Sequence, residues 1–537
     1  MKRIVTLLVL GIVLSGLAAG QATRSITNDD MVGDVVFSSD TVYTLQGYVF
    51  VDSLESLTIE PGTVIKGAYG LQENASALII KRGGKIMAEG TETAPIIFTT
   101  ENDTDLDMDV DVRGEWGGLI LLGNGLHNNL DNANEIEGIP PEQMAYYGGD
   151  IEDDNSGSLK YVSIRHGGIE LAPDEEINGL TLGAVGSGTE ISFVEVVANK
   201  DDGIEWFGGS PKCDHIIVVN VGDESFDWDE GVRFWGQYFA AVQNYNGNNV
   251  GDKVGEHDGS PSGNRESDYI AHPLVSNVTY IAKDDHSDKL LVMRENTGGE
   301  YHNSIMMNGD PINIGYVEGA EDSWYQVDEA GTLKMMNNIF YGTAGDVKDD
   351  IFTVYAEVDG ETVPTDVTDK MKTYFDAWNN VIADPGVAWD NLVPTGDVSG
   401  TSYEGLPDWF STVGYKGAFN PAVSGHWAGG WTKTYADVAY NDEEGVVIGI
   451  NENKHAYAAA SIYPNPVQQF AVVNFDNPDN EPFSFTVYNM SGQAVKSIRN
   501  ISGSQFEFSR TGMQAGVYFY ILKGENNIAF TGKMMVD

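Results

Sequence analysis

The stretch ANKDDGIEWFGGSPKCDHIIVVNVGDESFDWDEG, residues 198–231, decides the fold. Within it, DDGIEWFGG at 201–209 and DESFDWDEG at 223–231 align without a gap at an offset of 22 residues. A repeat of this length, with short β-rich runs and glycine turns, is typical of one coil of a parallel β-helix. We therefore expect successive 22-residue segments to lie directly over one another as neighbouring parallel strands.

Alternation assigns the side chains of these strands to an inner and an outer side. It places Ile204 and Trp206 over Phe226 and Trp228 inside the core. The same parity predicts that three further sets of residues face inward and stack on one another: Val194, Val196 and Ala198; Ile216, Val218 and Asn220; and Ala240, Val242 and Asn244. The asparagines of the last two sets are expected to form a hydrogen-bonded ladder inside the helix.

Residues 35–345 alternate short β-rich runs with turns of Gly, Asn and Asp, and no amphipathic helix interrupts them. The chain contains 63 glycines, which suit sharp corners, so the body at 23–440 is predicted to be all-β. After residue 345 the period fades, and Thr368 to Trp378 are predicted to form a helix. We expect residues 346–440 to cap the open end of the helix, because a bare last coil exposes core and strand edges.

The composition is strongly acidic. There are 81 acidic and 30 basic side chains, a formal net charge of -51, and the acids are spread along the chain. This charge argues against nucleic acid as a partner. With 41% hydrophobic residues the chain still builds a large core and is not a disordered polyanion. Two explanations of the charge remain open: solubility in a salty medium that screens repulsion, or neutralisation by bound divalent cations.

Both ends of the chain carry distinct patterns. Two basic residues and an apolar run to Leu17 are followed by small residues, which predicts a signal peptide over residues 1–22. The run is shorter than the roughly 20 residues that span a bilayer, and no later stretch is long enough, so we expect no transmembrane segment in the mature chain. An acidic, Ala-rich linker at 441–460 leads to a compact β pattern at 461–537.

The body resembles a known family. The segments that carry the resemblance are RGEWGGLILLGNG at 113–125, GSLKYVSIRHGG at 157–168, ANKDDGIEWFGG at 198–209, GDESFDWDEG at 222–231 and NTGGEYHNSI at 296–305, with YKGAFNP at 415–421 and WAGGWT at 427–432 as a closing segment. Over roughly 35–435 the chain resembles exported right-handed parallel β-helix proteins of Bacteroidetes. The resemblance implies the fold and supplies no catalytic residues.

The C-terminal segment carries a second resemblance. Its landmarks are SIYPNP at 461–466, TVYNMSGQAV at 486–495, GVYFYIL at 516–522 and TGKMMV at 531–536. It resembles the type A C-terminal sorting domain of the type IX secretion system, which implies a small Ig-like β-sandwich recognised by that machinery. The family's domain is usually removed after export, and the cargo is released or attached to surface lipopolysaccharide. The resemblance therefore predicts a secreted protein, at the cell outer surface or extracellular.

Neighbouring coils lie about 4.8 Å apart, so the repeat brings acids of one coil next to acids of the next. The predicted pairs are Asp201 with Asp223, Asp202 with Glu224, and Glu205 with Asp227, with Asp229 beside them. Like charges at this distance raise one another's pKa unless a cation stabilises the ionised forms. We predict a Ca²⁺ site made of these seven residues, because Ca²⁺ takes about six to eight oxygen ligands. A solvated acidic corner is the alternative.

The same acids suit a second hypothesis, an enzyme acting on polysaccharides, because a separation of one coil approximates the roughly 5 to 5.5 Å between the carboxyls of retaining glycosidases. Arg165 with His166, and Glu256 with His257 and Asp258, are candidate binding groups. A hydrogen-bonded turn histidine is the alternative for both histidines. The Gly-His-Gly and RIK segments of pectinase-type hydrolases are absent from the sequence.

Two further features are predicted to be structural. Four acids at alternate positions resemble the opening of an EF-hand loop: Asp105, Asp107, Asp109 and Asp111. The loop lacks glycine at its sixth position and has Trp116 where the bidentate glutamate belongs, so we expect a polar insertion. Cys213 is the single cysteine, which excludes an internal disulfide, and we expect it to be buried.

The sequence therefore favours a surface-displayed or released β-helix that acts as a binding or adhesion scaffold, for glycans and stabilised by calcium, since no complete catalytic set is visible. A polysaccharide lyase or glycoside hydrolase is the second hypothesis. An enzyme requires a groove with converging acids, a basic residue and exposed aromatic rings, whereas a scaffold requires only a flat acidic face.

Overall fold

The computed structural model describes residues 21–438 and 461–536, with gaps at 71–74, 130–133, 170–176, 261–268, 359–360, 464, 476, 478–481, 490–493 and 525–528. The chain divides into two compact units, residues 1–446 and 447–537. Apart from Gln21 and Ala22, the predicted signal peptide lies outside the described residues, and so does the whole predicted linker at 441–460.

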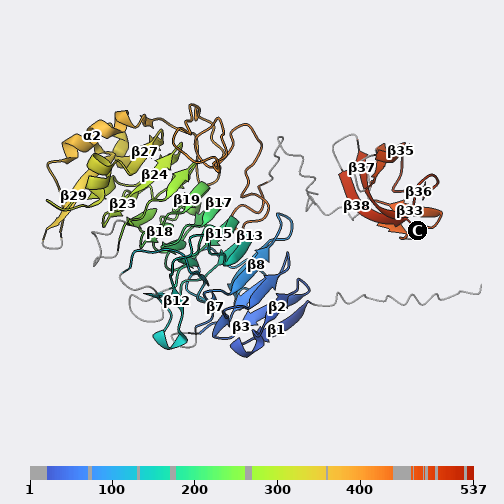
Figure 1. Ribbon diagram of the computed structural model, residues 1–537. Helices are drawn as coiled ribbons and strands as arrows, with labels where there is room; N and C mark the ends of the chain where they lie inside the picture. The colour runs from blue at the N-terminus through green and yellow to red at the C-terminus, as the bar shows by residue number, and fades with distance from the viewer. Residues whose placement is uncertain are drawn as a thin grey trace, which may run out of the picture. The chain divides into compact units, whose positions relative to one another are not determined.

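Parallel strands arranged in three columns build the first unit. Figure 1 shows these strands stacked along the chain from β1 (Ala22–Ile26) in blue to β29 (Phe352–Val358) in yellow. One column forms an 11-stranded sheet of β4 (Tyr48–Val51), β7 (Ala77–Ile80), β10 (Leu119–Leu122), β14 (Leu180–Gly183), β16 (Ile204–Phe207), β18 (Phe226–Asp229), β20 (Gly255–Asp258), β23 (Leu291–Arg294), β26 (Ile312–Gly315), β29 (Phe352–Val358) and β30 (Glu361–Pro364). Within it only β29 and β30 pair antiparallel among the described residues.

The other two columns join in an 18-stranded parallel sheet. Its strands are β1 (Ala22–Ile26), β2 (Asp34–Phe37), β3 (Thr41–Leu45), β5 (Ser56–Ile59), β6 (Val64–Gly67), β8 (Lys85–Glu89), β9 (Ile96–Thr100), β13 (Gly157–Arg165), β15 (Glu190–Val197), β17 (Lys212–Val219), β19 (Trp235–Val242), β21 (Leu274–Ser276), β22 (Thr279–Ile281), β24 (Gly299–His302), β25 (Ile305–Met307), β27 (Leu333–Met336), β28 (Ile339–Tyr341) and β31 (Val381–Ile382). The two sheets together form the predicted parallel β-helix.

The 22-residue register is confirmed at the repeat that predicted it. Strands β16 and β18 pair in parallel, with Ile204 opposite Phe226 and Trp206 opposite Trp228. These four side chains are almost fully buried inside the helix, and Cys213 on β17 is buried with them. The core is thus an aromatic and aliphatic stack in which each coil packs on the next.

One part of the predicted core is wrong by a single residue. Strand β19 pairs with β17 at an offset of 23, so Ala240 and Val242 lie opposite Ile217 and Val219. A slip of one residue moves a side chain to the other face of a strand. Ala240 and Val242, and Ala198 as well, therefore belong to a second apolar cluster on the outer side of the 18-stranded sheet.

The predicted ladder between Asn220 and Asn244 is also not formed. Asn220 has a left-handed backbone, with φ of 60°, and its Nδ2 donates to the carbonyl of Val110 at 3.0 Å. A real asparagine ladder lies in later coils, where Nδ2 of Asn337 donates to Asn303 at 2.8 Å and Nδ2 of Asn379 donates to Asn337 at 2.7 Å. These corners also have positive φ, a conformation that asparagine tolerates better than most residues.

The predicted helix closes the last coils. Helix α2 (Thr368–Ala377) buries Met371 and Phe375 in the same core as the inward side chains of the strands. The ring of Phe375 lies 5.9 Å from that of Phe340 and 6.3 Å from that of Phe352. A helix therefore covers apolar side chains that the final coil leaves uncovered.

The remaining helical turns and the short hairpin lie in the connections between strands. They are η1 (Asn28–Asp30), η3 (Pro141–Gln143), η4 (Tyr245–Gly247), α1 (Ser323–Tyr325), η5 (Gln326–Ala330), η6 (Thr343–Asp346) and η7 (Lys348–Asp350), with the antiparallel pair β11 (Asn134–Glu135) and β12 (Tyr146–Tyr147).

Residues 383–438, here named the strap, correct the predicted cap. We expected all of 346–440 to close the end of the helix, but the strap contacts the outer side of the 18-stranded sheet along several coils. Asn303 donates to Ser402 O at 2.8 Å, and Gln237 donates to Ser411 O at 2.8 Å. The period fades in this segment because it packs against the side of the helix and does not form another coil.

Aromatic rings anchor the strap. Tyr161, Phe193 and His215 stack on one another at 4.4 and 4.3 Å along the outer side of the sheet. Trp431 meets Tyr161 edge-on at 5.5 Å, and Trp427 meets His215 edge-on at 5.2 Å. Both tryptophans are buried, so the strap shields an aromatic row that the helix alone leaves on its surface.

The second unit is a small antiparallel β fold. One sheet contains β32 (Ser461–Tyr463), β33 (Phe470–Asn474) and β36 (Gln505–Ser509), and the other contains β34 (Phe483–Tyr488), β35 (Ala494–Ile501), β37 (Gly516–Gly524) and β38 (Ala529–Val536). Phe508 of the first sheet and Phe485 of the second are buried with rings 5.4 Å apart. The two sheets fit the predicted Ig-like sandwich.

No helix in the part of the chain that the structure describes is long and apolar enough to cross a membrane.

The strap supplies a first prediction. Glu195 is fully buried and accepts hydrogen bonds from the backbone N–H of Lys433 at 2.8 Å and of Thr434 at 3.2 Å. Replacing Glu195→Ala leaves these donors without an acceptor, at about 1–3 kcal/mol. We expect hydrogen exchange at 427–435 to accelerate at least tenfold, while the control variant Lys160→Ala on the exposed side of β13 leaves it unchanged. Unchanged protection in both variants contradicts the anchoring role.

Candidate functional site

The acids predicted from the repeat lie on the outer side of the 11-stranded sheet. In β16, β18 and β20, inward side chains alternate with outward carboxylates. Glu205 lies opposite Asp227, and Asp227 lies opposite Glu256. The same alternation that buries the tryptophans therefore lines up one carboxylate per coil along the surface.

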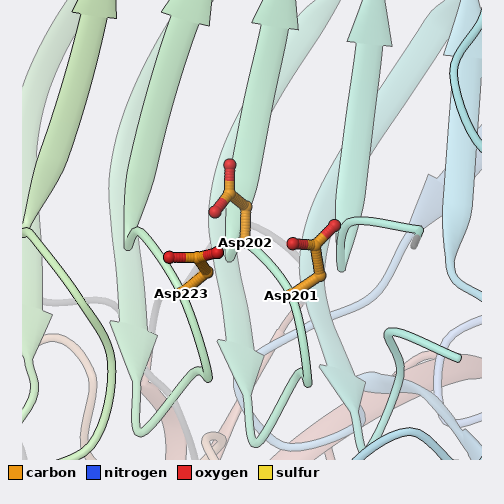
Figure 2. Close-up of side chains that lie close together, drawn as sticks. All are labelled: Asp201, Asp202 and Asp223. Carbon is orange, nitrogen blue, oxygen red and sulfur yellow. The ribbon is translucent and has the colours of Figure 1, made fainter. Parts of the chain in front are cut away.

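A second row of acids precedes these strands at the turns. Figure 2 shows Asp201 and Asp202 on one turn and Asp223 on the neighbouring one. Oδ1 of Asp202 accepts a hydrogen bond from the backbone N–H of Glu224 at 2.8 Å, which fixes one turn against the next. We name the two rows together the acidic strip: Asp201, Asp202, Glu205, Asp223, Glu224, Asp227, Asp229, Asp252, Glu256 and Asp258.

Three overlapping groups within the strip bring carboxylate oxygens within 4.8 Å of one another: Asp201, Asp202 and Asp223; Asp202, Glu205 and Asp227; and Asp223, Glu224 and Asp252. The structure thus brings together six of the seven residues predicted as calcium ligands, and Asp229 is the one outside the groups. Asn178 adds an amide whose Nδ2 donates to Glu205 at 2.5 Å. A donor set of carboxylate oxygens fits a hard cation such as Ca²⁺.

Burial and mutual repulsion disfavour the ionised carboxyls. Burial is the main cause that raises the pKa of Asp202, Glu205 and Asp227 well above the usual range. The charged groups that act most strongly on these three carboxyls are all other acids. Without a bound cation, this half of the strip therefore favours protonated carboxyls.

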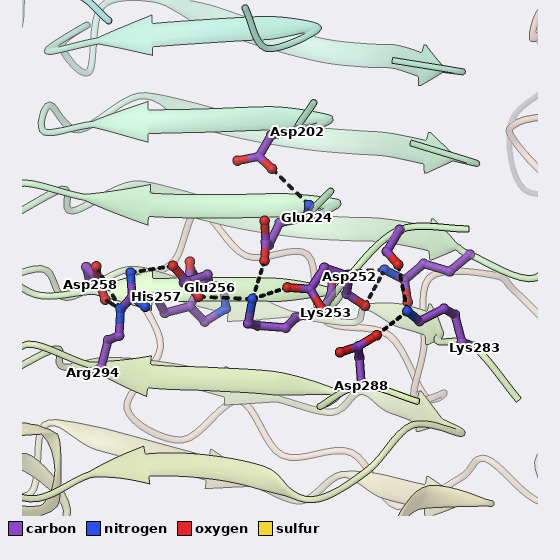
Figure 3. A network of polar contacts seen from close by, with 12 residues as sticks. Asp202, Glu224, Asp252, Lys253, Glu256, His257, Asp258, Lys283, Asp288 and Arg294 are labelled. Carbon is purple, nitrogen blue, oxygen red and sulfur yellow. Dashed lines mark hydrogen bonds and ion pairs between the residues drawn. The ribbon is translucent and has the colours of Figure 1, made fainter. Parts of the chain in front are cut away.

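The other half of the strip contains its own cations (Figure 3). Nζ of Lys253 lies 2.7 Å from Glu224 and 3.2 Å from Glu256. Nε of Arg294 donates to both oxygens of Asp258 at 2.8 and 3.1 Å, and the guanidinium also contacts Glu256. These ion pairs offset part of the negative charge in this half, whereas the charges that act most strongly on Asp202, Glu205 and Asp227 are other acids.

Comparison with known proteins agrees with this architecture. Residues 29–384, more than half of the chain, match the family described as pectate-lyase-like β-helix domain. The chain belongs to this family. No curated protein and no solved structure matches it. Membership shows the fold, which the parallel registers show independently.

The second unit matches a different family. Residues 461–537 match the secretion system C-terminal sorting domain, with the boundary that the sequence predicts. The domain carries a type IX sorting signal, so the protein is exported to the cell surface or the extracellular space and interacts with the type IX secretion machinery. The pectate-lyase-like family member is therefore a secreted β-helix protein.

The five residues predicted to bind a ligand fall in different places. Glu256 and Asp258 lie in the acidic strip, but His257 between them points into the helix. Its ring stacks on Trp228 at 3.3 Å, and its Nε2 shares a hydrogen bond of 2.8 Å with the hydroxyl of Tyr301. Burial lowers the pKa of His257 to about 3, so this histidine is a neutral core residue and does not join its neighbours at the surface.

Arg165 and His166 lie on the 18-stranded sheet, away from the strip. Arg165 is buried, and its Nε donates to the hydroxyl of Ser163 at 2.7 Å, which in turn donates to Glu195. His166 has a left-handed backbone, with φ of 60°, and its Nδ1 bonds the carbonyl of Val112 at 2.8 Å. His166 is therefore a hydrogen-bonded turn histidine, the alternative given above. Both residues are buried, so neither is accessible to a ligand at the surface.

The aspartate-rich loop is a polar insertion, as expected. Oδ1 of Asp111 accepts a hydrogen bond from Asn220 at 3.2 Å, so the end of the loop packs on a corner of the helix. Among the described residues, none of the close carboxylate groups includes Asp105, Asp107, Asp109 or Asp111.

Sequence reasoning missed the residues that complete the strip. Asp252 and Lys253 sit one coil beyond Asp223 and Glu224, but that coil is longer than 22 residues, since Phe226 pairs with Gly255. Arg294 lies opposite Asp258 on the coil after that. A repeat pattern that allows coils of different length would identify Asp252 and Lys253 from the sequence. Arg294 occupies the position that holds Asp229 and Asp258 in the preceding coils. Because it is a basic residue at an acidic position, the repeat pattern does not identify it.

The raised pKa values predict the dependence of stability on pH. Burial raises the pKa of Glu224 to about 8 and that of Asp229 and Asp258 to about 7, above their unfolded values near 4. The folded state then holds protons that the unfolded state releases, so stability falls as pH rises through these pKa values.

We expect the purified protein in a chelator to lose about 3 kcal/mol between pH 6.5 and 8.5, measured by urea unfolding. The buried His257 and His426, with pKa values of about 3 and about 4, act in the opposite direction, because the unfolded state binds their protons up to about pH 7.5; within this window their effect is smaller than that of the three carboxyls. Stability that is constant or rises across the window contradicts the protonated strip.

Proposed function

We propose that the protein is an exported surface scaffold that binds Ca²⁺ along its acidic strip and presents this face to glycans. The observation that supports the proposal is the group of Asp202, Glu205 and Asp227, whose carboxylate oxygens lie within 4.8 Å of one another. The strongest charges around these three acids are negative, so a divalent cation is the partner that best relieves their repulsion.

The chemistry of the strip favours Ca²⁺ over other metals. Its side-chain donors are oxygens, and the nearest histidine in sequence, His257, faces the core. Zn²⁺ prefers nitrogen and sulfur ligands, and Mg²⁺ demands a near-octahedral geometry that a row of flexible turns does not impose. Ca²⁺ accepts six to eight oxygens in irregular geometry, so adjacent coils with two acids each suit it.

A role in binding follows from the placement of the strip. Its acids lie along one side of a rigid stack of coils, and several, among them Asp201 and Asp223, are partly or fully exposed. A cation held there by exposed carboxylates keeps coordination positions for water or for the acidic groups of a polysaccharide. Attachment of the exported chain to surface lipopolysaccharide is a further part of the proposal, since the cargo of this sorting-domain family is either released or attached there.

Calcium titration tests the proposal. We expect Ca²⁺ added to the chelated protein at pH 8 to raise its unfolding free energy by about 2.7 kcal/mol at a concentration 100-fold above the Kd, and to release heat in calorimetry. The double variant Glu205→Gln/Asp227→Asn removes two ligands. In chelator the double variant is expected to have a higher unfolding free energy than the wild type, because it lacks two mutually repelling acids. It is also expected to lose the stabilisation by Ca²⁺.

Asp105→Asn provides the matched control, because it removes one exposed charge outside the strip. It is expected to keep the full calcium response. A wild-type protein that shows neither heat nor stabilisation contradicts calcium binding. A double variant that keeps the full response shows that Glu205 and Asp227 are not the calcium ligands.

A polysaccharide lyase or glycoside hydrolase is a second candidate, favoured by one specific observation. Burial raises the pKa of both Asp229 and Asp258 to about 7, and Arg294 contacts Asp258. A carboxyl with a pKa near neutrality serves as a general acid or base, and an arginine beside it stabilises negative charge.

Product release decides between the two functions. If the protein is an enzyme, incubation with a panel of acidic and neutral polysaccharides yields reducing ends or unsaturated uronides, and Asp258→Asn lowers the rate at least a hundredfold. The Asp105→Asn protein is expected to retain full activity. No product from any polysaccharide in the panel counts against catalysis and leaves the binding role in place.

A further inference from the structure

The sorting domain exposes apolar side chains on one side of its three-stranded sheet. Tyr463 on β32 is 78% exposed, and Phe470 and Val472 on β33 are 51% and 40% exposed. Tyr463 lies directly opposite Val472 in the antiparallel register, and Phe470 is two residues away on the same side. Alternate residues of β33 are buried in the domain core, so this face is formed by regular strand geometry.

The charge of the domain differs from that of the rest of the chain. Residues 461–537 contain six acidic and five basic side chains, which leaves 75 acidic and 25 basic side chains for residues 1–460. A protein that maintains solubility with a net charge near -50 elsewhere has almost none here. An apolar face on a nearly neutral domain is typical of a surface that binds another protein.

A pocket adjoins this face at the end of β33 and β36. It is lined by Gln468, Gln469, Phe470, Arg510, Thr511, Gly512 and Met513. The turn that forms it is fixed, since the backbone N–H of Arg510 donates to Gln469 O at 3.1 Å and that of Met513 donates to Arg510 O at 2.9 Å. Phe470 therefore belongs both to the apolar face and to the wall of the pocket.

The guanidinium of Arg510 is incompletely satisfied. One of its terminal nitrogens, Nη1, is buried and has no hydrogen-bond acceptor among the described residues. A carboxylate is the acceptor that matches a guanidinium best. The seven residues that line the pocket include no acidic side chain, so the charge of Arg510 is not matched within it.

We propose that the outer face of β32, β33 and β36, together with the Arg510 pocket, is the surface that the type IX secretion machinery grips. The partner segment presents apolar side chains to Tyr463, Phe470 and Val472 and places a carboxylate on Arg510. This inference rests on the export signal of the domain and is independent of calcium binding at the β-helix.

The second sheet offers a matched control. Val517 and Phe519 on β37 are 37% and 44% exposed, so they are apolar residues of comparable exposure in the same domain. Neither of them lines the Arg510 pocket. If apolar surface alone promoted recognition, variants of the two sheets would behave alike.

Export of the full chain in the producing bacterium tests the proposal. We expect Phe470→Ser/Val472→Ser and Arg510→Ala each to lower the fraction of protein at the cell surface or in the medium at least tenfold, with accumulation in the periplasm. Val517→Ser/Phe519→Ser is expected to stay within twofold of the wild type. Arg510→Lys is expected to be intermediate, because lysine keeps the charge and loses the fork of donors.

Folding and self-association are measured on the purified full chains. A variant counts only if the sorting domain keeps its resistance to proteolysis, and the calcium response at the β-helix is expected to be unchanged in all of them. Export of Phe470→Ser/Val472→Ser and Arg510→Ala within twofold of the wild type overturns the proposal, and so does an equal loss in the Val517→Ser/Phe519→Ser control. A wild-type dimer in sedimentation that these substitutions abolish assigns the face to a second copy and also overturns it.

Discussion

The in-register stacking of parallel strands is the constraint on which the rest of this protein depends. Because each coil lies about 4.8 Å from the next, a residue type that recurs at one position of the coil becomes a column in space. Inside the helix this brings Trp206 over Trp228, and apolar rings gain contact from the repetition. Outside, the same repetition brings Glu205 beside Asp227, where identical charges repel. The same stacking therefore produces both the packed aromatic core and the repulsion between neighbouring acids.

The structure meets that problem in two ways along one face. In the later coils Lys253 and Arg294 insert positive charge between the acids, and these ion pairs involve groups on different coils. In the earlier coils burial and neighbouring acids raise the pKa of Asp202, Glu205 and Asp227, which leaves protonation or an external cation as the available compensation. The sorting domain has the opposite character, since it is nearly neutral and exposes apolar residues. The two units therefore differ in the kind of surface that they expose.

Much of the fold was predictable because the repeat is local. The 22-residue offset, the inward tryptophans, the outward acids and the closing helix all follow from patterns within one or two coils. The prediction failed where coil length changed: one residue fewer than assumed placed Ala240 and Val242 on the outer side. It also failed for the strap, which packs on distant parts of the sequence; Glu195 and Lys433, for example, are 238 positions apart. A repeat pattern cannot predict such contacts, because the surface on which the strap packs exists only after the coils have assembled.

The sequence by itself determined the coil, the alternation that separates core from acids, and the sorting domain, because each depends on residues close together in the chain. Only the tertiary structure decided that His257 faces the core while Glu256 and Asp258 face outward, and that Arg294 meets them from the next coil. It alone placed Arg165 under the strap and Arg510 beside an apolar face. The physical reason is that burial and pairing of a charge depend on which distant segments pack around it, and that packing is a property of the folded chain.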